Sequence, residues 1–321
     1  MVVTALAILL FSIAVLSRSS AMVIESAVKL SRFFNINQIA MGFLLVAVAT
    51  SLPELSVSVS SSLAGQGAIS AGNVFGSNIA NILIILGVGA FLYGVKISPS
   101  NLKDIGIVLL LTTIISVYII FSSSVQHKAL NFIEGAVLLG IFGVYVWSTL
   151  RKKKLSNNRP RITVPKKAAL KAFLFFGLGI IIVIVSSAFV VDSAVEIADS
   201  LGIAHSFIGA TIIAVGTSLP ELGTALHALR RKHYGLVLGN AIGSNMANIT
   251  LVLGAASMIN PIEVKLPIFI AALLFAVIAN SILFYVAAIH KGMNKLGGAL
   301  FLLVYIVYLV AIFGLQVGEL P

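Results

Sequence analysis

Two glutamates in strongly apolar surroundings are the residues of this sequence best suited to chemistry. Glu54 stands in the run Thr-Ser-Leu-Pro-Glu-Leu at positions 50–55, and Glu221 stands in the same run at positions 217–222. In each run a threonine and a serine precede the glutamate by four and three residues, which puts hydroxyls and carboxylate on one helical face. Oxygen atoms of this kind are ligands for a hard cation. The hydroxyl-bearing residues are Thr50, Ser51, Thr217 and Ser218.

A proline directly precedes each glutamate. Pro53 and Pro220 lack a backbone N–H and clash with the carbonyl four residues earlier, so we expect both helices to break there. The break would free the carbonyls of Ala49 and Gly216. In a membrane, such carbonyls must face protein, water or an ion.

A second motif is duplicated together with the first. The pattern Gly-Asn-x-x-Gly-Ser-Asn-x-x-Asn occupies residues 72–81 and returns at 239–248. Its polar residues recur at a spacing of four, which makes a polar stripe on a helix, and its glycines allow close helix packing. We expect interhelical hydrogen bonds from Asn73, Asn78, Asn240 and Asn245. We expect the site to be lined by Ser77, Asn81, Ser244 and Asn248.

The amino-acid composition indicates that this chain lies in a lipid bilayer. It is 59% hydrophobic and 10% charged, with a mean hydropathy of +1.11, and it has several runs long enough to cross a bilayer. It contains no cysteine, which excludes disulfides and thiolate metal ligands. Both motifs recur with the same shift, 167 residues, so the chain is expected to be an all-α, polytopic membrane protein built from two repeats.

About ten transmembrane helices are predicted, with the second and seventh broken at the prolines. The first repeat occupies residues 1–150, a basic linker 151–171, and the second repeat 172–321. The predicted helices are 1–33, 38–63, 70–92, 104–123, 130–149, 172–198, 205–229, 235–258, 265–288 and 296–316.

Five crossings in each half place the second repeat upside down relative to the first. With both termini outside, nearly all loop Lys and Arg residues fall inside, and only Lys128 and Lys265 fall outside. We therefore expect a cell-membrane protein whose central basic loop is cytoplasmic. The basic clusters are interpreted as topology signals beside anionic lipid and not as a nucleic-acid site.

The donor set favours a metal cation with a preference for oxygen. Carboxylates, amide oxygens, hydroxyls and carbonyls suit Ca²⁺, Na⁺ or a proton, whereas transition metals prefer imidazole or thiolate. The histidines are expected at helix ends, away from the glutamates: His127, His205, His227, His233 and His290. Two ionised glutamates balance one Ca²⁺, and an empty site would take up protons or monovalent cations, which is the competition that antiport requires.

Other classes of protein fit less well. A channel uses similar oxygen ligands, but inverted repeats with broken helices favour alternating access. An intramembrane enzyme is disfavoured because no nucleophile–base pair or metal-binding histidine motif appears. Glu25 and Asp192 occupy equivalent positions in the two repeats, where interfacial anchoring is favoured over ion binding, and Arg18 either shares the face of Glu25 or snorkels.

The paired motifs at 50–55 with 72–81 and at 217–222 with 239–248 closely resemble the two alpha-repeats of cation/Ca²⁺ exchangers, in particular the archaeal and bacterial Na⁺/Ca²⁺ exchangers. The resemblance covers nearly the whole chain. It implies that the glutamates and the neighbouring hydroxyl and amide residues bind the ions directly. It also implies that the first and sixth helices, here 1–33 and 172–198, slide across the remaining bundle.

The coupling ion is left open between Na⁺ and H⁺. Some microbial relatives have an aspartate where this chain has Asn248, so two carboxylates and not three are expected here, and protonation of both would cancel the site. The serines Ser77 and Ser244 favour sodium by resemblance to the Na⁺ branch. No cofactor and no obligate protein partner are expected besides the transported ions and the lipid.

Overall fold

The computed structural model describes residues 2–33, 51–97, 99–126, 130–153, 165–262 and 266–317. Nearly all of these residues are helical, because long apolar runs in lipid satisfy their backbone hydrogen bonds within the helix. The helices of the first half are α1 (Val2–Phe33), α3 (Leu52–Leu63), α4 (Gly67–Ala80), η1 (Asn81–Leu86), α5 (Gly87–Tyr93), α6 (Pro99–Gln126) and α7 (Phe132–Lys153). The elements η1 to η4 are π-helical turns.

The second half repeats this order of elements. Its helices are α8 (Lys166–Leu201), α9 (His205–Ile208), η2 (Gly209–Ile213), α10 (Ala214–Thr217), α11 (Leu219–Arg230), α12 (Tyr234–Ala247), η3 (Asn248–Val252), α13 (Leu253–Ile259), α14 (Leu266–Tyr285), η4 (Val286–His290) and α15 (Lys295–Val317). Two short strands, β1 (Val95–Lys96) and β2 (Gly292–Met293), pair antiparallel and are a small addition to the expected all-helical fold.

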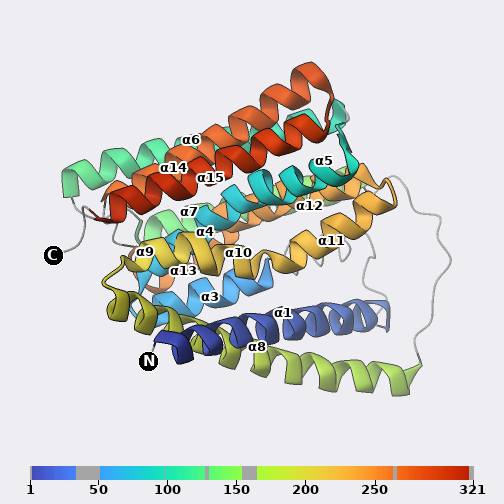
Figure 1. Cartoon of the computed structure of the whole chain (residues 1–321). Helices are drawn as coiled ribbons and strands as arrows, with labels where there is room; N and C mark the ends of the chain where they lie inside the picture. Colours follow the sequence, from blue (N-terminus) through green and yellow to red (C-terminus); the bar gives the residue numbers. More distant parts are fainter. Residues whose placement is uncertain are drawn as a thin grey trace.

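The helices lie in three layers (Figure 1). The long helices α1 and α8 run side by side at the bottom of the view, and α6, α14 and α15 lie at the top. Between them lie α3, α4, α9, α10 and α11, which carry both glutamate motifs. The motifs are therefore in the middle layer, covered by helices on both sides.

Helix pairing joins the two halves throughout the molecule. Helix α1 packs on α8 and α6 packs on α14, so equivalent helices of the two repeats are partners. Helix α5 packs on α15, and its counterpart α13 packs on α7 in the same way. This exchange of partners shows that the two repeats form one interlocked unit and not two separate domains.

Contacts between loops are consistent with the expected membrane sides. Gln66, between α3 and α4, bonds to His205 at the start of α9, and both positions are expected on one side. Leu130 and Ile262 form a β-bridge on that same expected side. The β1–β2 ribbon joins two loops that are both expected on the opposite side.

Close helix contacts require several of the glycines. A Cβ atom at Gly76 would lie 2.5 Å from the carbonyl oxygen of Ala210, and one at Gly72 would lie 2.5 Å from that of Ser206. On the facing turn η2, a Cβ atom at Gly209 would lie 2.6 Å from the carbonyl oxygen of Ile69. The glycines of the second motif thus let α4 contact η2 backbone to backbone.

The apolar interior is divided into two clusters. The larger one spans the middle and upper layers, and the smaller one joins α1 to α8 through residues such as Leu9, Leu16, Val190 and Ala194. The same cluster includes Val57, Ile69, Ile208 and Ile213, so it also joins the α1–α8 pair to the middle layer.

Six described helical segments are long and apolar enough to cross a membrane, and a seventh is the pair formed by 205–217 and 219–230, bent by 42°. Two shorter apolar stretches lie in α6 and α7. The chain is a multi-pass membrane protein with two repeats, as predicted, whereas the count of ten crossings stays a prediction. Helix α8 begins at Lys166 and not at 172, because Pro165 starts the helix and alanines follow within the first turn.

We expect the substitution Gly76→Ala to destabilise the folded protein by about 1–3 kcal/mol, because the added methyl group meets rigid backbone. Thermal unfolding of the detergent-solubilised protein measures this effect. The control is Gly143→Ala in α7, where no described atom lies within 4 Å of the added Cβ and alanine favours the helix. A Gly76→Ala protein as stable as the control would contradict the close contact.

Candidate functional site

The carboxylate of Glu54 lies in the first turn of α3, which begins at Leu52. Ser51 is the N-cap of this helix, with φ −87° and ψ 11°, and Pro53 occupies the first turn. The side chain of Glu54 is only 1% exposed. The positive end of the helix dipole favours a carboxylate at this position.

Glu221 has the same local structure in the second half. It lies in the first turn of α11, 1% exposed, and Ser218 is the N-cap with φ −87° and ψ 3°. Here both sides of the break are described, and the helix bends by 42° between Thr217 and Leu219. The shared sequence has thus produced nearly identical backbone at the starts of α3 and α11.

Glu54 adjoins the helix break of the second half. The Ser218 hydroxyl donates to Oε1 of Glu54 over 3.0 Å, although the residues are far apart in sequence. The Ser77 hydroxyl lies close by and donates to the Ala214 carbonyl (3.3 Å), just before the same break. A carboxylate of the first half is therefore held by a hydroxyl of the second half, at the point where a helix of that half is interrupted.

Asn73 fixes this arrangement from α4. Its amide group donates to the backbone carbonyl of Glu54 (3.2 Å) and to the Ser58 hydroxyl (3.0 Å). Its amide oxygen accepts from Thr217 over 3.2 Å. Asn73 thus has the interhelical role predicted for it, and it connects the two breaks through α4.

A second set of amides joins α4 to α12. The Asn81 amide group donates to Oδ1 of Asn245 (2.9 Å), and Asn245 donates to the backbone carbonyl of Asn78 (3.2 Å). Asn81 and its counterpart Asn248 each begin a π-helical turn, η1 and η3. Such turns carry one extra residue, change the direction of the following side chains and occur often at functional sites.

Several buried oxygen atoms of the predicted site have no hydrogen-bond partner among the described residues. They are Oε2 of Glu54, Oγ of Ser51, Oδ1 of Asn81 and Oδ1 of Asn248. Buried polar atoms are nearly always satisfied, so each such atom needs an explanation. Oxygens of this kind are the ligands that a dehydrated Ca²⁺ or Na⁺ would require.

The remaining predicted residues have varied positions. Ser244 is buried on α12, at the place equivalent to Ser77. The Ser218 N–H contacts the Gly216 carbonyl and also donates to the Ala214 carbonyl (3.2 Å). The Gly216 carbonyl is therefore less free to bind an ion than the loss of the Pro220 N–H alone implies. Ala49 and Thr50 lie outside the described residues.

Several buried serines near the glutamate site were not predicted from the sequence. Ser58 bonds to Asn73, and the hydroxyls of Ser61, Ser62 and Ser70 are buried without a described partner. The signal was present, because serines recur throughout residues 56–62, whereas the equivalent part of α11 has few hydroxyls. Hydroxyl side chains are therefore more numerous along α3 than along the equivalent part of α11.

Histidine does not contribute to the glutamate site in the described part of the chain. No group of three or more His, Cys, Asp or Glu side chains there is arranged to hold a metal. His205 lies at a helix start, where it bonds to Gln66 (2.8 Å) and Asp199 (2.9 Å). The arrangement suits a cation bound by mixed oxygen ligands.

Comparison with known proteins finds matches over nearly the whole chain. The family model described as "Sodium/calcium exchanger protein" matches residues 4–151 and 171–314. An uncharacterized membrane protein of Methanocaldococcus jannaschii, MJ0091, is 32% identical over 296 residues, which cover 90% of this chain and 91% of that protein. The sodium/calcium exchanger MaX1 of Methanosarcina acetivorans is 26% identical, with 95% and 97% covered.

A solved structure has the same architecture. The sodium-calcium exchanger NCX_Mj superposes with a TM-score of 0.66 at 29% sequence identity, and the match covers 97% of this chain and 99% of that one. The two-repeat fold and the resemblance proposed from the motifs are both confirmed by these matches.

We expect Ser51→Ala to weaken Ca²⁺ binding by roughly tenfold without lowering the stability of the ion-free protein, because the lost hydroxyl has no described protein partner. Isothermal titration calorimetry and thermal unfolding measure the two effects. The control is Ser56→Ala, which removes only a local bond to the Leu52 carbonyl (2.8 Å). Unchanged affinity in Ser51→Ala would remove this residue from the site.

Proposed function

Because this chain belongs to the sodium/calcium exchanger family, we propose that it is an antiporter that exchanges Ca²⁺ for Na⁺ across the cell membrane. One observation carries the proposal: Glu54 at the start of α3 meets Ser218 at the helix break before α11, among buried oxygens that have no hydrogen-bond partner in the described part of the chain. As members of an exchanger family are transporters, the chain is not an enzyme.

The proposed Ca²⁺ ligands come from both repeats. Glu54 and Glu221 supply the charge, and neutral oxygens come from Ser51, Thr217, Ser218, Ser77, Asn81, Ser244 and Asn248. Thr50 and the carbonyls of Ala49 and Gly216 belong to the same proposal on the basis of sequence. A mixed set of this kind suits Ca²⁺, which accepts six to eight oxygen ligands in flexible geometry.

The charge of the site explains why an ion must be present. No Lys or Arg occurs in residues 51–95, 205–229 or 234–259, which form the helices around the glutamates. Two ionised carboxylates in this environment are costly unless a cation neutralises them. One Ca²⁺ does so, and Na⁺ ions replace it by competing for the same oxygens.

Alternating access is assigned to the α1–α8 pair. This pair packs on the middle layer through the smaller apolar cluster, and Ile13 of α1 lies against the helix break, where a Cβ atom at Gly216 would be 2.6 Å from the Ile13 Cδ1 atom. Sliding of the pair along the bundle would expose the site to one side and then to the other. A channel needs no such mobile layer, and its flux would not require a counter-ion.

Proton coupling is a second candidate. It is favoured by the presence of Asn248 in place of a third carboxylate, because protonating only two glutamates cancels the charge of the site. The same residues would then serve Ca²⁺/H⁺ exchange.

The orientation follows from loop charges, with the central basic segment 151–171 in the cytoplasm and both termini outside. The proposed partners are the transported ions and the lipid bilayer, without nucleic acid.

We expect Glu54→Gln and Glu221→Gln each to abolish Ca²⁺ uptake by proteoliposomes, to below about 1% of wild type, because one charge no longer balances the divalent ion. The control is Glu196→Gln on α8, a carboxylate in neither motif, which should retain uptake. Substantial uptake by either motif variant would refute the two-carboxylate site.

We expect an outward Na⁺ gradient at equal pH to drive Ca²⁺ uptake into the same vesicles, while a pH gradient without Na⁺ drives none, since Na⁺ occupies the vacated oxygens. Uptake is measured with ⁴⁵Ca²⁺ under the two gradients separately. Uptake driven by pH alone would replace sodium with the proton as coupling ion and leave the site unchanged.

A further inference from the structure

A cavity of about 760 Å³ lies between α1 and α8, outside the glutamate site. Each helix contributes one face to it, because the lining residues recur at intervals of three or four along both helices. Small residues such as Ala14, Ser19 and Ala172 leave the space open. The Ser19 hydroxyl is already bonded to the Val15 carbonyl (2.9 Å), so the polar character of the cavity comes from its charged residues.

The charges of the cavity are unbalanced. Arg18, Lys29 and Lys171 line it, and Glu25 is its single carboxylate. The structure gives none of the three cations an ion pair within the described part of the chain. Arg18 and Glu25 do share a face, as the sequence suggested, yet the net charge of the lining is positive. An anion is the complement of such a surface.

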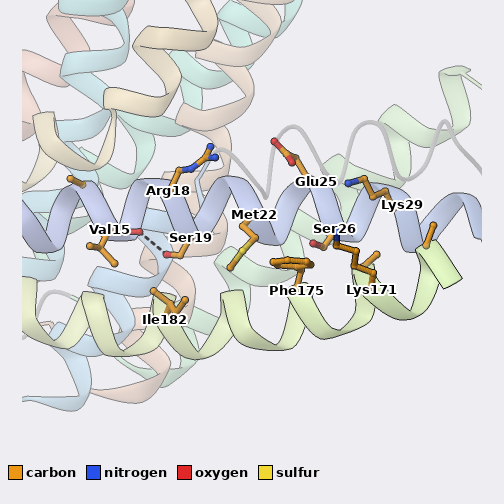
Figure 2. A pocket seen from close by; sticks show the side chains of 13 residues that line it. Val15, Arg18, Ser19, Met22, Glu25, Ser26, Lys29, Lys171, Phe175 and Ile182 are labelled. Atoms are coloured by element: carbon orange, nitrogen blue, oxygen red, sulfur yellow. Dashed lines mark hydrogen bonds between the residues drawn. The ribbon is translucent and has the colours of Figure 1, made fainter.

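The apolar residues of the cavity continue from its basic end. Figure 2 shows Lys29 and Lys171 toward one end, Phe175 and Met22 next along the cavity, and Ile182 toward the other end, where Arg18 lies on the opposite side of α1 from Ile182. The Lys171 ammonium is 5.7 Å from the centre of the Phe175 ring. A ligand that fits has a negative head and an apolar body.

The cavity also borders on lipid. On α8, Leu170, Phe173 and Leu174 are each more than 60% exposed, as expected for a helix that faces acyl chains. Lys29 and Lys171 belong to the loops and helix ends that the positive-inside rule places at the cytoplasmic face. A ligand can therefore enter sideways from the membrane, with its head at the headgroup level.

We propose that this cavity binds an anionic phospholipid, whose phosphate contacts Lys29 and Lys171 and whose acyl chains lie against Phe175, Met22 and Ile182. The lipid would then be held between the two helices that form the separate bottom layer of the molecule (Figure 1). The proposal does not depend on which ion is exchanged.

The test uses native mass spectrometry of the delipidated full-length protein, titrated with phosphatidylglycerol or with phosphatidylcholine of the same acyl chains. We expect the wild-type protein to prefer phosphatidylglycerol by roughly tenfold. The double variant Lys29→Gln/Lys171→Gln should lose this preference, and Glu25→Gln should increase it, because the competing carboxylate is removed. The opposite signs of the two effects separate loss of the site from loss of folding.

The matched control is Lys96→Gln/Lys103→Gln, which removes two exposed cations on the same expected membrane side but outside the cavity. It should keep the preference. Equal binding of both lipids by the wild type, an equal loss in the control, or a decrease in Glu25→Gln would each overturn the proposal. Displacement of phosphatidylglycerol by 10 mM inorganic phosphate would show that the cavity takes the free anion and not the lipid.

Discussion

The structure depends on two carboxylates, Glu54 and Glu221, buried among described helices whose residues 51–95, 205–229 and 234–259 contain no Lys or Arg. Removing an ion from water costs several kcal/mol unless other charges or hydrogen bonds compensate. Here the compensation for Glu54 is partial: the Ser218 hydroxyl donates to one carboxylate oxygen, while the second oxygen has no described hydrogen-bond partner. The described residues leave the charge incomplete, and we propose that a transported cation completes it.

The rest of the fold can be understood as the means of holding this pair in place. A proline in the first turn of α3 and of α11 places a carboxylate at each helix start, and the glycines of α4 let its backbone contact η2 closely. Asn73 then connects one break to the other. Because α1 packs on α8, α6 on α14, α5 on α15 and α7 on α13, the two repeats hold the site together.

Much of this was predictable from sequence because the signals are local. The prolines predict breaks, the glycine spacing predicts close packing, and the shift of 167 residues predicts two equivalent halves. The π-helical turns at Asn81 and Asn248 were not predicted, since an extra residue in a helix depends on what packs against it. The direction of the Asn81 amide toward Asn245 and the role of Ser58 were missed for the same reason. The spacing of residues along one helix does not predict which residues of a distant helix they will contact.

The central claim is that Glu54 and Glu221 bind one and the same Ca²⁺. The most direct measurement is a crystal structure of protein soaked in Sr²⁺, which replaces Ca²⁺ and has a strong anomalous signal. The account predicts one anomalous peak in contact with both carboxylates and with oxygens from Ser51, Ser218, Asn81 or Asn248. A peak that contacts neither glutamate, or separate peaks at each, would contradict it.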